Sequence, residues 1–331
     1  MENDAPTVEA TPPRYSLPLR RFRQLAIVTV AGVCLLTVAG AVVRLTGSGL
    51  GCDDWPNCNN ERFIDVSTGH AAIEQLNRLL SGFIGIPTLL LAIGAFRVFP
   101  RRVGLRWPSI GVLVTILGNG VVGGLAVRGD LHPSLVQSHF ILAMLSIGFG
   151  SIAVHRSHPA PVGDGRSIGV TPLVTALIWT LGALVAAALV TGTVVTGAGP
   201  HAGDETARRY GFDISTVAEV HSVVVWATIA VFLTLVVVLR RTPSLHRRLS
   251  SMLSTWMFVA VIQGGIGYLQ YFTDVPAVLV AAHVAGATAL WVFTVQLMLA
   301  GLEPVDVVEE EVHDPETGQA PRISPATIPS A

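Results

Sequence analysis

Long apolar stretches, separated by short polar segments, run through most of the chain. A helix needs about 20 mainly apolar residues to cross the hydrocarbon core of a bilayer, and these stretches are about that long or longer. The pattern predicts eight membrane-spanning helices, at residues 25–43, 72–96, 108–127, 131–154, 171–196, 215–239, 252–272 and 275–302. We therefore expect an all-α polytopic membrane protein.

Polar residues and glycines recur within these stretches at a separation of 144 residues. His139 and His283 match in this way, each about two turns inside the start of its stretch, and Asn77 matches the intramembrane His221. The other matches are Leu135 with Leu279, Val136 with Val280, Gly120 with Gly264, Val122 with Ile266 and Gly123 with Gly267. The chain is therefore predicted to be a duplicated membrane unit of four helices.

The first and fifth stretches also correspond, residues 40–43 with 192–195, at a separation of 152. Because each unit has an even number of helices, its two copies share one orientation, related by an axis along the membrane normal. The predicted fold is thus two pseudo-symmetric four-helix bundles that form a parallel repeat. Its parts are a disordered N-terminal tail (1–24), the first repeat (25–155), a linker (156–170), the second repeat (171–302) and a disordered acidic C-terminal tail (303–331).

The distribution of charge predicts the orientation. All the basic residues are arginines, and most of them lie in the N-terminal tail and in the loops after the second, fourth and sixth helices. The opposite loops hold Arg44, Arg62, Arg128, Arg208 and Arg209. The positive-inside rule therefore predicts a plasma-membrane protein with both termini in the cytoplasm. The net charge of -1, without a basic patch, argues against a nucleic-acid partner.

Three histidines, His139, His221 and His283, are predicted at one depth inside the bundles. A lone histidine in a membrane helix can simply hydrogen-bond a neighbouring helix, but intramembrane ionisable groups are costly and tend to be functional. Because His221 and His283 lie on different helices of one bundle, ligation of a haem iron by two imidazoles accounts for both. A zinc site would require further ligands at that depth, and the sequence offers none.

The first repeat has Asn77 at the position of His221, and an amide is a poor iron ligand. A macrocycle there would be held by His139 alone or with a weak sixth ligand, which suits a bound substrate. Glu74 precedes Asn77 by three residues, on the same helix face. It is either an acid/base group beside the porphyrin or a carboxylate that complements the helix dipole and pairs with Arg78. Arg78 and Arg44 are candidate partners of the propionates.

Two cysteines, Cys52 and Cys58, share the first loop on the predicted outer side. Disulfides persist in oxidising compartments, so this pair is predicted to form one. The bond is either structural or redox-active.

These residues resemble those of the haem A synthase family of the CtaA type over almost all of residues 24–302. The likeness rests on residues 47–52 leading into Trp55, Pro56 and Cys58, on Ile73 and Glu74 followed by Asn77 and Arg78, and on the three histidines. It implies that His221 and His283 bind a cofactor haem b, and that the first bundle holds haem O as substrate. It also implies that successive hydroxylations convert a ring methyl to a formyl group, with Glu74 as the essential glutamate.

The resemblance further implies a place in cytochrome oxidase assembly, with the enzyme that makes haem O as a candidate partner and a homo-oligomer as an open alternative. The sequence departs from the family at Asn77, where many members have histidine, and in residues 197–215, which lack a second cysteine pair. Two other functions remain as alternatives. One is a non-catalytic carrier with two b-type haems, which the missing ligand at Asn77 disfavours. The other is a parallel-repeat transporter, which would show broken helices at mid-membrane.

Overall fold

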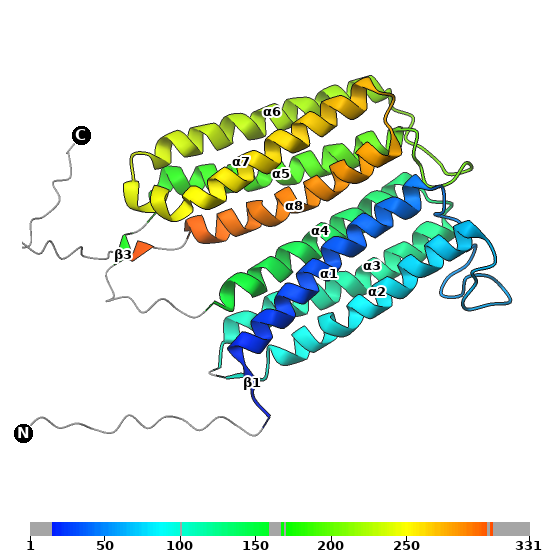
Figure 1. Ribbon diagram of the computed structural model, residues 1–331, viewed down its shortest axis with the longest axis horizontal. Coiled ribbons are helices and arrows are strands. Elements are labelled where there is room, and N and C mark those ends of the chain that lie inside the picture. Colours follow the sequence, from blue (N-terminus) through cyan, green and yellow to red (C-terminus); the bar gives the residue numbers. More distant parts are fainter. Residues whose placement is uncertain (1–14, 100, 159–166, 169, 303–304, 307–331) are drawn as a thin grey trace, which may run out of the picture.

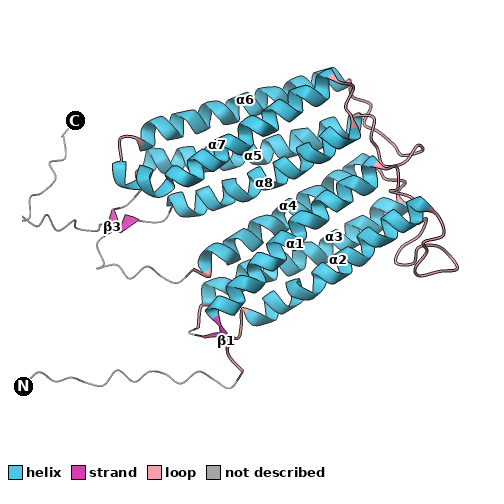
Figure 2. Ribbon diagram, viewed as in Figure 1, coloured by secondary structure: helices cyan, strands magenta, loops and turns pink. Residues whose placement is uncertain are grey.

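The structure is a computed structural model that describes residues 15–99, 101–158, 167–168, 170–302 and 305–306. Most of the predicted N-terminal tail, part of the predicted linker and almost all of the predicted C-terminal tail lie outside these residues. The described chain is almost entirely helical (Figure 2).

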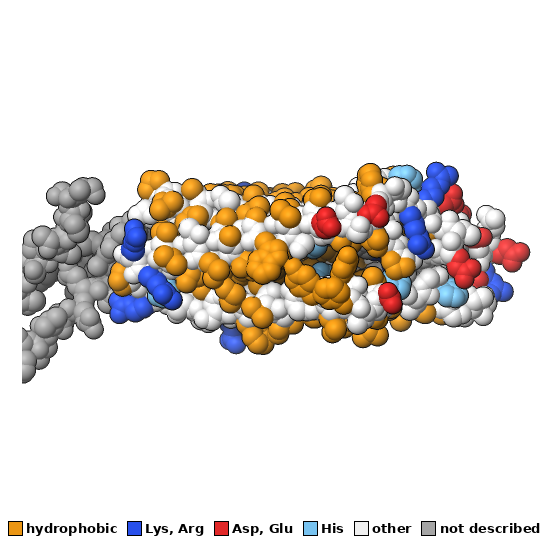
Figure 3. All heavy atoms as spheres, turned by 90° about the horizontal axis from the view of Figure 1, so that it is seen from above, with side chains coloured by type: hydrophobic (Ala, Val, Ile, Leu, Met, Phe, Trp, Pro, Cys, Tyr) orange, Lys and Arg blue, Asp and Glu red, His pale blue; other side chains and the backbone are white. Residues whose placement is uncertain are grey.

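Eight long helices make up the described part of the chain, and each is long and apolar enough to cross a membrane. They are α1 (Leu19–Leu45), α2 (Gly69–Gly94), α3 (Arg106–Arg128), α4 (Pro133–Arg156), α5 (Pro172–Ala198), α6 (Ile214–Leu239), α7 (Pro243–Phe272) and α8 (Ala277–Leu302). A short 3-10 turn, η1 (Val103–Leu105), leads into α3. Apolar side chains cover the middle of the molecule, with charged side chains toward its two ends (Figure 3). The prediction of an all-α multi-pass membrane protein is confirmed.

Two helices begin earlier than the apolar pattern predicted. The first starts at Leu19 rather than residue 25, and the seventh starts at Pro243 rather than residue 252. The added turns contain arginines, whose long side chains can lie along a helix end while the guanidinium reaches water. Arginine is also a good helix former, so the charge that ends an apolar stretch does not end the helix. The assignment of residues 19–24 to a disordered tail was therefore wrong.

Side-chain caps fix the starts of the helices that carry the predicted site. The Thr68 hydroxyl accepts a hydrogen bond from the Ala71 N–H at the start of α2, and Asp213 accepts one from the Thr216 N–H at the start of α6. Such caps satisfy backbone donors that the first turn leaves without an intrahelical partner. Because these caps set where α2 and α6 begin, they also set the positions of Glu74 and Asn77 along α2 and of His221 along α6.

Two pairs of very short strands were not predicted. Strand β1 (Leu17–Pro18) pairs in parallel with β2 (Val98–Phe99), and β3 (Ser167–Ile168) pairs antiparallel with β4 (Val305–Asp306). Each pair has two residues per strand, too short to give an alternating pattern in the sequence. The pairs connect the chain before α1 to the end of α2, and the segment before α5 to the segment after α8.

The helices form two groups, α1 to α4 and α5 to α8, which lie side by side (Figure 1). The groups contact each other through α1 and α4 on one side and α5 and α8 on the other. The loops 46–68 and 199–213 lie at one end of the molecule, which we call the disulfide end. The start of α1 and the end of α8 lie at the opposite end (Figure 1). The 144-residue symmetry itself stays a prediction.

The apolar core of the second group fills only the half that is far from the disulfide end. It contains the stacked pair Phe232 and Trp256, whose ring centroids are 4.1 Å apart. In these fully described helices, no residue is buried in α5 after Val185, in α6 before Thr228, in α7 after Ala260 or in the first third of α8. Protein interiors are normally close-packed. The disulfide-end half of this bundle therefore has room for a bound group.

Candidate functional site

Each of the three predicted histidines lies against a glycine of the preceding helix. A Cβ atom built on Gly123 would be 3.1 Å from His139 Cε1, one on Gly192 would be 3.2 Å from His221 Cε1, and one on Gly267 would be 3.1 Å from His283 Cε1. The hairpins α3–α4, α5–α6 and α7–α8 thus seat an imidazole in the same way. Because any larger residue would crowd the ring, these glycines fix where each imidazole lies. In the sequence these glycines stand out only as matched positions of the predicted repeat.

Thr191 lies against the ring of His221. Its Oγ1 is 2.9 Å from His221 Nδ1 and donates to the Ala187 carbonyl at 2.9 Å. In this arrangement the hydroxyl accepts from Nδ1, which then carries the ring proton. The Nε2 lone pair of His221 is left available to a metal, and the ring orientation is fixed as in many metal-ligating histidines.

His283 lies in the same bundle, close enough to His221 for the two imidazoles to interact electrostatically. Its Nδ1 is buried without a hydrogen-bond partner among the described residues, and so is Gln263 Oε1 on α7. The Gln263 amide donates to the His283 carbonyl at 2.8 Å. Buried polar atoms without partners are uncommon. Two imidazoles beside an unfilled bundle interior and such atoms fit a bis-imidazole haem.

Figure 3 shows the face of this bundle formed by α6 and α7. The surface is hollowed toward the disulfide end, and histidine side chains are visible inside the hollow. Among the adjacent helix pairs of each bundle, one pair makes the fewest contacts: α2 with α3 in the first bundle, and α6 with α7 in the second. The interior at the histidines is therefore closest to the outside through these two faces.

The first bundle lacks the second imidazole. Asn77 is at the position of His221, and its Oδ1 is buried without a partner in the described chain. Gly40, which matches Gly192, has nothing within 4 Å of a Cβ built on it. Asn119, at the position of Gln263, also has a buried Oδ1 without a described partner. His139 is exposed, whereas His221 and His283 are partly buried. One accessible imidazole and two unpaired amide oxygens thus surround this part of the bundle.

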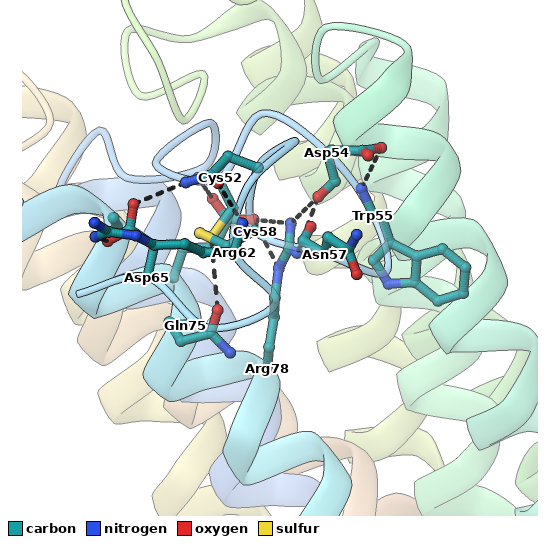
Figure 4. The surroundings of a disulfide bond; sticks show 12 residues. Cys52, Asp54, Trp55, Asn57, Cys58, Arg62, Asp65, Gln75 and Arg78 are labelled. Atoms are coloured by element: carbon teal, nitrogen blue, oxygen red, sulfur yellow. Dashed lines mark hydrogen bonds and ion pairs between the residues drawn. A yellow bond between two sulfur atoms is a disulfide. The ribbon is translucent and has the colours of Figure 1, made fainter. Parts of the chain in front are cut away.

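Glu74 and Arg78 join α2 to the first loop rather than facing an open space. Glu74 is 5% exposed, and its Oε1 accepts from Arg78 Nε at 3.1 Å and Nη2 at 2.7 Å. Its Oε2 accepts from the Cys52 N–H at 2.8 Å. Arg78 also donates to the carbonyls of Asp54 and Asn57, so that five hydrogen bonds occupy its five N–H groups (Figure 4). These contacts favour a loop anchor over a propionate partner for Arg78.

Cys52 and Cys58 form a disulfide with an S–S distance of 2.01 Å, which confirms the predicted pairing (Figure 4). Both residues are 1% exposed, and Cys52 Sγ lies 3.8 Å from Gln75 Oε1 on α2. Buried sulfurs are poorly accessible to an attacking thiolate. This burial favours the structural alternative, in which the bond closes the loop over Glu74.

Arg44, the other candidate propionate partner, lies at the junction of the two bundles. Its Nη2 donates to the Thr196 carbonyl of α5 at 2.7 Å. Nearby, the Gly49 N–H donates to the Gly203 carbonyl at 2.8 Å, so the two large loops also contact each other. Arg44 therefore lies at the disulfide end, where the two bundles meet.

Comparison with known proteins bears on these residues. The profile of a family described as cytochrome oxidase assembly protein (COX15-CtaA) matches residues 23–72 and 63–295. The chain belongs to this family. The match includes all three histidines, Asn77 and Glu74. The family resemblance predicted from the sequence is confirmed.

The chain is also similar to curated proteins named heme A synthase. It is 30% identical over 128 residues to the one from Geobacillus kaustophilus (strain HTA426), covering 38% of this chain and 40% of the relative. It is 28% identical over 157 residues to the one from Alkalihalophilus pseudofirmus (strain ATCC BAA-2126 / JCM 17055 / OF4), covering 47% and 52%. For the one from Bacillus cereus (strain AH187) the values are 30% over 130 residues, 39% and 42%. The chain thus spans about half the length of the curated relatives it matches.

Proposed function

We propose that this protein is a haem A synthase, which oxidises a ring methyl of haem O to a formyl group. The observation that carries the proposal is the set of glycine seats. Three hold an imidazole, and the fourth, Gly40, has nothing within 4 Å of a Cβ built on it. Two unlike sites in one chain suit one resident haem and one exchangeable haem substrate. The relatives named heme A synthase support the same reaction.

In the second bundle, His221 and His283 would hold the iron of a haem b. When bound, that haem supplies one-electron redox chemistry. Thr191 would keep the Nε2 lone pair of His221 directed away from the hydroxyl, because Nδ1 is the nitrogen that bonds it. The unfilled half of the bundle would exclude water from the group once it is occupied.

In the first bundle, His139 would hold the iron of the substrate, and the smaller Asn77 would leave the opposite face open. Two hydroxylations of one methyl carbon give a geminal diol, which loses water to leave the formyl group. We assign Glu74 as the acid/base group of this reaction. Its carboxylate now accepts from Arg78 and from the Cys52 N–H, so moving a proton would require it to exchange one of these hydrogen bonds. Arg44 would pair with a propionate at the disulfide end.

The proposed location is the plasma membrane, with both termini in the cytoplasm and the disulfide end outside. The arginine distribution supports this orientation, and so does the disulfide, since such bonds persist in oxidising compartments. The proposed partners are the cytochrome oxidase assembly pathway and the enzyme that supplies haem O. A homo-oligomer stays open.

The test is to purify the protein from cells that make haem O, extract its non-covalent haems and identify them by chromatography and mass. Haem b together with haem O, a hydroxylated intermediate or haem A is the expected result. Haem b alone would instead favour the electron carrier with two b-type haems. Absence of any haem would indicate that His221 and His283 have only a structural role.

A further inference from the structure

The first loop places a tryptophan directly against α3, beside the proposed substrate ligand. A Cβ built on Gly124 would be 2.6 Å from Trp55 Cδ2, so the indole lies on the bare backbone of that glycine. The preceding residue, Gly123, seats His139. Trp55 and His139 therefore contact neighbouring residues of one helix. The indole therefore packs on α3 one residue along the helix from the seat of the imidazole.

The loop that carries this tryptophan bridges α2 and α3. We call residues 52–58 the Trp55 loop. From α2, Arg78 donates to the carbonyls of Asp54 and Asn57 at 3.0 Å (Figure 4). From the end of α3, Arg128 donates to the Trp55 carbonyl and, at 3.3 Å, to Asp54 Oδ1. The Trp55 loop thus covers the disulfide end of the face between α2 and α3, the two adjacent helices of this bundle that are in least contact.

On the corresponding face of the second bundle, side chains of the helices themselves bridge α6 and α7. At the 144-residue separation, Gly82 and Gly124 correspond to Trp226 on α6 and Tyr268 on α7. Trp226 Nε1 donates to the Tyr268 hydroxyl at 3.1 Å, and Ser222 Oγ lies 3.3 Å from the same hydroxyl. Tyr268 follows Gly267, the seat of His283, just as Gly124 follows Gly123. Both bundles therefore have an aromatic ring beside the histidine seat.

The origin of the ring differs between the bundles. In the second, both aromatic residues belong to helices, so their backbone is fixed and only the side chains can turn aside. In the first, Gly82 has nothing within 4 Å of a Cβ built on it, and the ring belongs to a loop. Loops are the more mobile parts of proteins and commonly act as lids. The closure of the first bundle can therefore open while its four helices stay in place.

The face between α2 and α3 opens to lipid. Both helices carry large exposed apolar side chains: Leu76, Leu79 and Phe83 on α2, and Val121 and Leu125 on α3. A mainly apolar porphyrin that partitions into the bilayer would reach the first bundle through such a face. A route through the disulfide end would first require it to enter water.

We propose that the face between α2 and α3 is the passage through which the substrate porphyrin enters from the membrane and the product returns to it, with Trp55 as its gate. In the second bundle, the hydrogen-bonded pair of Trp226 and Tyr268 bridges α6 and α7 at the equivalent place and helps to retain the resident haem. This inference rests on the proposed function for the identity of the two porphyrins. Trp55 is a positioning residue at the entrance, and it takes no part in the oxidation.

The test follows each haem as it leaves the protein in lipid nanodiscs. Protein loaded with haem O and haem b is mixed with excess apomyoglobin, and the haems still bound are extracted over time and separated by chromatography. Trp55→Ala is expected to release haem O about tenfold faster and haem b at the wild-type rate, a change that corresponds to about 1.4 kcal/mol of lost aromatic contact. The double variant Trp226→Ala/Tyr268→Ala is expected to release haem b about tenfold faster and haem O at the wild-type rate.

A pair of glycine variants repeats the test without touching the loop sequence. Gly124→Ala places a methyl where the indole lies and should displace Trp55, so faster release of haem O is expected. Gly120→Ala on the same helix meets nothing within 4 Å and is the matched control. Trp179→Ala, an exposed tryptophan on α5, controls for the loss of an indole.

The proposed passage would be contradicted if Trp55→Ala accelerated the release of both haems equally. It would also be contradicted if the Trp55→Ala variant released haem O at a rate within twofold of that of Trp179→Ala. The same holds if Gly124→Ala behaves as Gly120→Ala does. Formation of haem A is measured separately in the same preparations. If haem A never forms but the release pattern holds, the passage stands and the proposed oxidation fails. If the wild type retains no haem O at all, both fail.

Discussion

Thr191 Oγ1 lies 2.9 Å from both His221 Nδ1 and the Ala187 carbonyl, so a hydroxyl that donates to its own helix accepts from the imidazole. One hydroxyl is thereby placed to orient a predicted iron ligand. The carbonyl acceptors Ala187 and Ala188 belong to the turn that precedes Gly192, the seat of the same ring. A single turn of α5 therefore provides both the space for the imidazole and the group that orients it.

The Thr191→Val variant keeps the shape of the side chain and removes the hydroxyl. Partners of metal-ligating histidines typically contribute about 10- to 100-fold to affinity, so haem b should bind at least about tenfold more weakly. Haem titration of the purified variant measures this change. Thr234→Val is the control, because Thr234 bonds the Ala230 carbonyl on the same helix, far from the imidazole. Equal haem affinity of the two variants would contradict the assignment of Thr191.

Substitution by alanine should affect only one of two glycines at corresponding positions. A methyl on Gly192 would lie 3.2 Å from His221 Cε1 and would push the ring from its seat, whereas a methyl on Gly40 meets nothing within 4 Å. We expect Gly192→Ala to lower the affinity for haem b by about tenfold, which corresponds to about 1.4 kcal/mol. Gly40→Ala should leave haem b content unchanged. Haem b content per protein, from extraction of both variants, decides between these outcomes.

The sequence predicted the parts of this fold that depend on hydropathy and on unusual residues. The eight helices follow from apolar length, and His139, His221 and His283 are conspicuous because ionisable groups are rare in membrane helices. The role of Arg78 was not predictable in the same way, since its partners include the carbonyls of Asp54 and Asn57, and carbonyls have no signature in a sequence. The contact of Trp55 with Gly124 joins a loop to a helix far along the chain, and only tertiary structure reveals it.

The stability of α6 should depend on pH through its N-cap, Asp213. Hydrogen bonds from the Ser215 hydroxyl and from Thr216 hold the pKa of this carboxyl below its usual range. A carboxyl with a lowered pKa in the folded state stabilises the protein above its unfolded pKa, and this contribution is lost as the pH falls through the folded pKa. We therefore expect the difference in Tm between wild type and Asp213→Asn to be constant near neutral pH. It should shrink as the pH is lowered through the acidic range of an aspartate. A difference that grows on acidification would contradict the capping role.

Glu74 and Arg78 allow catalysis and loop anchoring to be separated. Their side chains are 6% and 17% exposed, and removing one partner of a buried pair typically costs about 3–5 kcal/mol. Arg78→Met should therefore lower the Tm markedly, because it leaves the Glu74 carboxylate and the carbonyls of the Trp55 loop without their donor. Glu74→Gln keeps an oxygen that can accept from the Cys52 N–H and should lower the Tm much less. If Glu74 is the acid/base group, Glu74→Gln should nevertheless lose at least about 100-fold in haem A formation.

Paired measurements of Tm and haem A formation distinguish the two roles. A Glu74→Gln variant that forms haem A at the wild-type rate would show that this residue only anchors the loop. A Glu74→Gln variant as unstable as Arg78→Met would mean that the charge of the pair is needed for the fold. The activity of this variant would then be measured at a lower temperature, at which it is folded. The double variant Glu74→Gln/Arg78→Met completes a double-mutant cycle. Its Tm should exceed that of Arg78→Met if the unpaired carboxylate is what destabilises the single variant.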